Sequence, residues 1–170
     1  MDEAYYLSIF KKAASQLDKK ELSKKQMHVA TGLVLESVFL KLYKLNWANQ
    51  SPDPLTAPSR IFFSVWINDK GISENKVFYN IHALKLRQLN GYAITSRQFA
   101  IDFRNVFGKY EKHWPNVRTD FGPLTLMEGW VKLDAATTHD EIVQLAKSFL
   151  KIDHLIDELL EKNKKKALFT

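Results

Sequence analysis

The chain has 170 residues, with 25 Lys and Arg against 19 Asp and Glu, so its formal net charge is +6 at pH 7. Hydrophobic residues make up 45% and charged residues 26%, a composition typical of a globular protein, and we expect residues 1–170 to form a single domain. The lack of cysteine excludes disulfides, thiolate catalysis and Cys-ligated zinc or iron–sulfur centres. Because no basic leader and no long apolar stretch is found, we expect no membrane span and a cytoplasmic location.

Two helices are predicted at the start of the chain. Asp2 is a suitable cap, and apolar residues recur at helical spacing from there to about Leu17. Asp18 and Ser23 each begin a capping-box pattern, so a second helix starts at one of them and ends near Gly32.

The next segment, residues 33–46, is compatible with two structures. Its apolar residues recur at helical spacing, but Phe39–Leu45 also has a composition that a strand tolerates. We favour a helix for 33–46. Three prolines then predict an exposed loop over residues 47–59.

A β-hairpin follows this loop. Residues 60–68 and 76–86 are dense in β-branched and aromatic residues, with a turn at 69–71 between them. Both faces of the hairpin are apolar. In the first strand, Phe62 and Trp66 lie on one side, and the other side carries Ile61, Phe63, Val65 and Ile67. We therefore expect helices to cover the hairpin.

Three further elements complete the predicted fold. Thr95 caps a helix that runs to about Phe107, residues 124–133 form a third strand whose Gly129 marks a bulge, and a long helix runs from Thr138 to near Asn163. The resulting fold class is α+β: a small antiparallel sheet, made of the central hairpin and the third strand, packed with N-terminal helices, a middle helix and a long C-terminal helix. Asp153 falls within the apolar stripe of the last helix, so we expect it to pair with a cation.

The positive charge is concentrated in the middle of the sequence. Between Lys76 and Arg118 there are eight basic and two acidic residues, a surplus equal to the net charge of the chain. The same stretch is rich in aromatic residues and contains four of the five arginines. Cations neutralise phosphates and aromatic rings stack on bases, so this combination is one signature of nucleic-acid contact.

The favoured function is therefore a non-enzymatic binding domain for nucleic acid or another phosphate-rich polyanion. Two pairs of cations are spaced to project from one side of their elements, seven residues apart on a helix and two apart on a strand, and a loop adds a tryptophan and a fifth cation. The predicted ligand-binding residues are Lys85, Arg87, Arg97, Arg104, Trp114 and Arg118. Two alternatives stay open for them: amphipathic helices always turn charges outward, and Trp114 is the size of a core plug.

Two other functions remain open. One is a protein-interaction or oligomerisation module whose basic side meets an acidic protein surface. The other is an enzyme with a fold-assembled site near His82, which shares a strand face with Asn80 and needs an acid such as Glu128 or Asp120 beside it. No cofactor is expected and no metal site is predicted, because the histidine spacings do not place two ligands together and nucleotide-binding loops are absent from the sequence.

Overall fold

The computed structural model describes residues 1–50 and 53–167, and in these residues the chain forms five α-helices and one five-stranded antiparallel sheet. The predicted α+β class is confirmed. The strands are β1 (His28–Val34), β2 (Ser37–Tyr43), β3 (Arg60–Ile67), β4 (Lys76–Leu84) and β5 (Thr125–Lys132). The helices are α1 (Glu3–Ser15), α2 (Lys19–Lys24), α3 (Asp69–Glu74), α4 (Ser96–Phe107) and α5 (Thr138–Lys162), with 3₁₀ turns η1 (Leu45–Trp47), η2 (Leu86–Gln88) and η3 (Glu111–His113).

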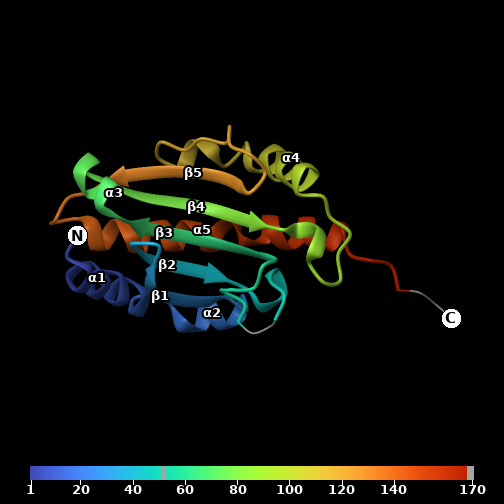
Figure 1. The fold of residues 1–170 in the computed structure, drawn as a ribbon, viewed down its shortest axis with the longest axis horizontal. Helices are drawn as coiled ribbons and strands as arrows, with labels where there is room; N and C mark the ends of the chain where they lie inside the picture. The colour runs from blue at the N-terminus through green and yellow to red at the C-terminus, as the bar shows by residue number, and fades with distance from the viewer. Residues whose placement is uncertain (51–52, 168–170) are drawn as a thin grey trace.

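The sheet is a simple meander in which every strand pairs with its neighbour in sequence, in the order β1-β2-β3-β4-β5 (Figure 1). Strands that follow one another in the sequence are joined by short connections, and such connections favour pairing between neighbours. None of the helices among the described residues has the length and hydropathy needed to cross a bilayer.

The second predicted helix is shorter than expected. Asp18 caps it as predicted, accepting hydrogen bonds from the backbone of Lys20 and Glu21. The helix ends at Lys24 because Gln26 adopts a left-handed conformation, with φ of 56°, and the chain then turns into β1. A left-handed residue just past the last turn is a common helix stop.

The helix favoured for residues 33–46 is wrong, because the segment contains the end of β1, a tight turn and the whole of strand β2. Leu35 and Glu36 form a two-residue hairpin turn, with φ of 47° and 62°, that reverses β1 into β2. Alternate residues of β2 then enter the core, and its backbone pairs with β1 on one side and β3 on the other. Hydrogen bonding along two neighbouring strands outweighs the helical spacing of the apolar residues.

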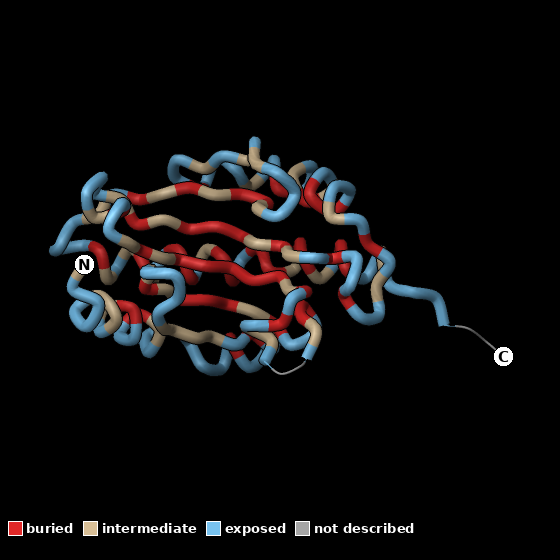
Figure 2. The backbone as a smooth tube through the Cα atoms, in the orientation of Figure 1, coloured by how far each residue is buried: buried red, intermediate tan, exposed pale blue. Residues whose placement is uncertain are grey.

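One face of the sheet carries the core. Helix α5 runs behind the sheet in Figure 1, and its Phe149 stacks on Phe63 of β3 with ring centroids 4.6 Å apart. Helix α1 packs against β1, β2 and α5, and α4 packs against β5 and α5. The residues that alternate onto this face are almost fully buried and appear as the red segments of the strands in Figure 2.

Helices were expected to cover the hairpin in either a two-layer or a three-layer arrangement. The structure has two layers, because no helix among the described residues covers the opposite face (Figure 1). In Figure 1 the helices lie behind the sheet or beside its edges. Phe62, Ser64 and Trp66 of β3 therefore face a surface open to solvent rather than a second core.

The buried ion pair expected for Asp153 is confirmed. Its carboxylate receives Lys44 Nζ at 2.7 Å and Lys25 Nζ at 3.1 Å. Asp157, one turn further along α5, accepts Lys44 Nζ and also the indole N–H of Trp47 at 2.8 Å. These bonds attach α5 to β2 and η1, because a buried carboxylate is stable only when paired.

Gly129 does not mark a bulge, as the sequence analysis expected. It pairs regularly with Tyr79, and the register shift between β4 and β5 lies at Ile81 and His82. A Cβ atom on Gly129 would collide with the hydroxyl of Tyr79, which donates a hydrogen bond of 2.6 Å to the Pro115 carbonyl. Glycine is required here by close packing.

Gly129→Ala should lower the free energy of unfolding by about 1–3 kcal/mol, because the added methyl group forces Tyr79 out of its buried position. Urea unfolding followed by circular dichroism measures the change. Gly122→Ala is the matched control, since a Cβ there meets open space. Equal stability of the two variants would contradict the close-packing role of Gly129.

Candidate functional site

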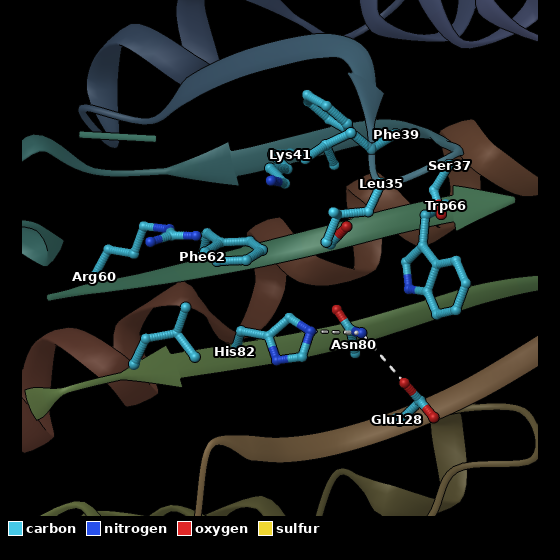
Figure 3. Close-up of a pocket in the computed structure, with 13 residues that line it drawn as sticks. Leu35, Ser37, Phe39, Lys41, Arg60, Phe62, Trp66, Asn80, His82 and Glu128 are labelled. Carbon is cyan, nitrogen blue, oxygen red and sulfur yellow. Dashed lines mark hydrogen bonds between the residues drawn. The ribbon is translucent and has the colours of Figure 1, made fainter. Parts of the chain in front are cut away.

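A cavity of about 330 Å³ lies on the open face of the sheet. Its walls come from β2, β3, β4 and β5 and from the turn between β1 and β2 (Figure 3). Aromatic, charged and polar side chains line it, among them Phe39, Lys41, Arg60, Phe62, Ser64, Trp66, Asn80, His82 and Glu128. The volume lies at the lower end of the range of small-molecule sites and equals that of about eleven water molecules in the liquid.

Strand pairing arranges the polar residues of this cavity in one row. Lys41 lies opposite Ser64, Ser64 opposite Asn80, and Asn80 opposite Glu128. The row therefore runs over four strands from the cation Lys41, through two uncharged polar groups, to the carboxylate of Glu128. Beyond β5, Arg118 lies directly opposite Glu128 in an isolated antiparallel bridge. Ser64 and Asn80 are 4% and 2% exposed, so the middle of the row is the cavity floor.

Aromatic residues border the polar row on both sides. One row, again set by strand pairing, contains Phe39, Trp66, Phe78 and Trp130. On the other side Phe62 lies opposite His82, with ring centroids 5.3 Å apart. A polar stripe between aromatic walls is the usual composition of a small-molecule site.

The two cations of the cavity share one aromatic ring. Lys41 Nζ lies 4.6 Å from the ring centre of Phe62 and 4.4 Å from that of Phe39, and the guanidinium of Arg60 lies 5.4 Å from Phe62. Lys41 is only 8% exposed, and in the described part of the chain neither cation forms an ion pair with a carboxylate. Aromatic faces offset part of the desolvation cost of a buried ammonium group, but they do not neutralise it.

The electrostatic consequence appears in the pKa of Lys41. Burial and, to a smaller extent, the neighbouring positive charge of Arg60 lower this pKa to about 8. Burial also lowers the pKa of the Arg60 guanidinium. This end of the cavity is therefore a positively charged, desolvated site that favours an anion.

His82 and Glu128 are connected through Asn80. The Asn80 amide donates to His82 Nε2 at 3.1 Å and to Glu128 Oε1 at 3.3 Å, and His82 Nδ1 lies 3.3 Å from the Leu124 carbonyl. This network assigns the neutral Nδ1–H tautomer to His82. Burial lowers the pKa of His82, which keeps the ring neutral near pH 7 although Glu128 and the Leu124 carbonyl oppose the shift.

Three buried polar atoms around the cavity have no hydrogen-bond partner among the described residues: the indole nitrogen of Trp66, the side-chain oxygen of Asn80 and the Nε of Arg60. Trp66 and Asn80 are diagonal neighbours on the same face of β3 and β4, and both project into the cavity in Figure 3. Unpaired buried donors and acceptors are rare in folded proteins and are costly.

Glu128 is the counterpart of Lys41 at the opposite end of the row. Its carboxylate is half-buried, accepts the Asn80 hydrogen bond and forms no ion pair within the described residues. The same residues hold no group of three or more acids or histidines arranged to bind a metal ion. The cavity thus contains opposite charges at its two ends, and neither forms an ion pair in the described residues, although Asp120 and, to a smaller extent, Glu128 raise the pKa of Arg118, which lies opposite Glu128.

The rim of the cavity is formed by the β1–β2 hairpin. Phe39 lies over Gly32, where a Cβ would come within 3.0 Å of the ring, so glycine lets the Phe39 ring lean over β1. Leu35, at the turn, is 93% exposed and lies beside the cavity. A leucine with positive φ and no cover costs conformational energy and contributes nothing to the core.

None of the ligand-binding residues predicted from the sequence lines this cavity. Arg104 uses its guanidinium within the protein, donating to the carbonyls of Phe121, Gly122, Thr125 and Leu126. Arg118 binds Asp120 through two hydrogen bonds of 3.0 and 2.6 Å. Trp114 is 5% exposed and lies among the rings of Tyr79, Phe107 and Phe149.

The other three predicted residues remain on the surface. Lys85 follows the end of β4, Arg87 lies in η2 and Arg97 lies in the first turn of α4. All three are exposed, and none makes an ion pair in the described ranges.

From the sequence, the Asn80, His82 and Glu128 part of the cavity is predicted, but its positive end at Lys41 is not. The alternation of Asn80 with His82, and the choice of Glu128 as a nearby acid, agree with the structure. Lys41 was missed because a helix over 33–46 directs it to solvent, whereas a strand places it on the face of Phe39. The aliphatic residues Val38, Leu40 and Leu42 recur at every second position, and this period-two spacing favours a strand.

A comparison of the chain with family models, curated proteins and solved structures finds no match. The function is therefore inferred from the geometry and chemistry of the cavity.

Lys41→Met should raise the free energy of unfolding at pH 7, because it replaces a buried ammonium group with an apolar side chain of similar length. The pKa of Lys41 is about 8 in the folded protein, against the ordinary value of 10.5 in the unfolded chain. Between about pH 8 and pH 10.5 the unfolded chain therefore binds up to one proton more than the folded protein. The stability of the wild type consequently rises with pH in this window, and the advantage of the variant shrinks.

Urea unfolding at pH 7 and at about pH 9.5 tests this pH dependence, with the exposed-lysine variant Lys112→Met as the control. A difference between Lys41→Met and wild type that stays constant with pH would show that Lys41 is not desolvated.

Proposed function

We propose that this protein binds a small organic anion, with a flat apolar body and a carboxylate or phosphate group, in the cavity on the open face of its sheet. The observation that carries the proposal is Lys41, an ammonium group 8% exposed and lacking a carboxylate partner in the described residues, at the end of an aromatic-lined cavity. An anionic group beside Lys41 and Arg60 would restore the missing charge balance.

The aromatic rows support the apolar part of the ligand. Phe39, Phe62 and Trp66 offer ring surface on both sides of the polar row, and ring surfaces favour planar ligands through stacking. A charge-assisted hydrogen bond to a buried cation contributes about 1.5–3 kcal/mol, enough to select an anion over a neutral analogue.

We expect 4-ethylbenzoate to bind at least about tenfold more tightly than the neutral analogue 4-ethylbenzamide, because only the benzoate pairs with Lys41 and Arg60. Titration followed by ¹⁵N–¹H NMR measures both affinities through the indole N–H signal of Trp66. That signal is assigned among the four tryptophans by comparison with Trp66→Phe.

The matched variants are Lys41→Met and Lys112→Met, which remove a cavity lysine and a surface lysine. Only the first should weaken 4-ethylbenzoate binding, again by about tenfold. Equal binding of the benzoate and the benzamide, or equal losses in the two variants, would overturn the proposal.

A second candidate function, polyanion binding, is favoured by a separate observation. Lys85, Arg87 and Arg97 are exposed and form no ion pair in the residues that the structure describes, so their charges are available to phosphates. They lie on loop and helix segments outside the cavity. This candidate and the cavity proposal are independent.

If these cations contact phosphates, replacing Lys85, Arg87 and Arg97 together with Gln should weaken binding of labelled DNA and RNA. The replacement should also reduce the salt dependence of binding, by about one unit of slope per lost contact. Fluorescence anisotropy at several salt concentrations provides the measurement. The charge-matched control replaces Lys11, Lys12 and Lys24, which are exposed on the N-terminal helices. Equal losses in the two triple variants would identify non-specific attraction and contradict a polyanion site.

A further inference from the structure

We infer that the occupant of the cavity is a zwitterion, with its anionic group at Lys41 and Arg60 and a cationic nitrogen at Glu128. This inference rests on the proposed function and extends it by defining the second end of the ligand. In the polar row, the ammonium of Lys41 and the carboxylate of Glu128 lie three strand spacings apart, and neither forms an ion pair in the described residues. Arg118, which lies opposite Glu128, is already paired with Asp120.

The carboxylate of Glu128 is oriented into the cavity by Asn80. The amide hydrogen bond of 3.3 Å holds one carboxylate oxygen, and Figure 3 shows the group beside Asn80 at the lower side of the cavity. A single neutral donor does not balance a half-buried carboxylate, which prefers two or three donors or a cation. A ligand ammonium or protonated ring nitrogen would complete this set.

The distance between the two ends suits a single small molecule. Lys41 and Glu128 are separated by three strand spacings, about 14 Å between Cα atoms. Their side chains cover part of this separation, and the cavity of 330 Å³ between them accepts one ring with short substituents. A ligand of that size places its two charged groups on opposite sides of the ring.

The middle of the cavity also favours a ligand over solvent alone. The unpaired indole N–H of Trp66 and side-chain oxygen of Asn80 offer one donor and one acceptor near the ring position. Both atoms are buried, and Asn80 is 2% exposed. Both atoms are closed to solvent, so a polar substituent of the ligand would pair with them only after a small movement of the Trp66 or Asn80 side chain.

Three probes with the same ring separate the two ends of the proposed ligand. 4-(Aminomethyl)benzoate carries both charges, 4-ethylbenzoate replaces the ammonium by a methyl group of the same size, and 4-methylbenzylamine lacks the carboxylate. We expect the zwitterion to bind about tenfold more tightly than 4-ethylbenzoate, and the amine to bind most weakly because Lys41 and Arg60 repel it. The Trp66 indole signal reports all three titrations.

Glu128→Gln assigns the cationic subsite. The variant keeps the side-chain shape and should weaken binding of 4-(aminomethyl)benzoate about tenfold, whereas 4-ethylbenzoate should bind as tightly or more tightly, because the variant removes a negative charge from the cavity. Lys41→Met should weaken both benzoates. Because 4-ethylbenzoate is measured in each variant, a general loss of folding or of the cavity is recognised by a parallel loss of that probe.

The outcomes distinguish this inference from the proposed function. Equal affinity of the wild type for the two benzoates, or insensitivity of the zwitterion to Glu128→Gln, overturns the zwitterionic ligand and leaves the anion site standing. Failure of both benzoates to bind overturns the anion site and the inference together.

Discussion

The stacking of Phe149 on Phe63 determines which face of the sheet is buried. Phe149 lies near the middle of α5 and also contacts the rings of Tyr79 and Trp114, so one helical residue joins β3, β4 and the segment after η3. The ion pairs from Asp153 and Asp157 to Lys44 attach the same helix to β2. With α5 fixed by both contacts, the core has a single side, and the side chains that alternate onto the other side of the strands cannot enter it.

This one-sided arrangement explains why apolar residues remain on an open face. A strand directs successive side chains to opposite faces, so β3 buries Ile61, Phe63 and Val65 and necessarily presents Phe62, Ser64 and Trp66 to the other side. A sheet face that contacts only solvent usually carries charged and small polar residues. The open face instead combines aromatic rings with buried polar atoms, and the energetic cost of that combination is understandable if a ligand occupies it.

The electrostatics of the cavity follow from its place in the sheet. Lys41 and Glu128 belong to one row of paired residues, but three strand spacings prevent them from neutralising each other. Ser64 and Asn80 separate them, and Asn80 is already engaged with His82 and Glu128. Separated charges of opposite sign in a partly desolvated cavity create a local field along the row, and this field orients a dipolar molecule.

The sequence by itself determined the α+β class, the caps at Asp2 and Asp18, strands β3 to β5 and the two long helices α4 and α5, because these depend on local periodicity and capping. It also determined that Asn80 and His82 share a face. Tertiary structure decided that residues 37–43 form a strand, since the backbone pairing with β3 joins residues more than 20 positions apart in the chain, such as Leu42 and Phe63. It also decided that Trp114 and Arg104 make internal contacts and that Lys41 faces Glu128 across the sheet. Residues 41, 64, 80 and 128 are far apart in the chain, and only the strand register places them in one row.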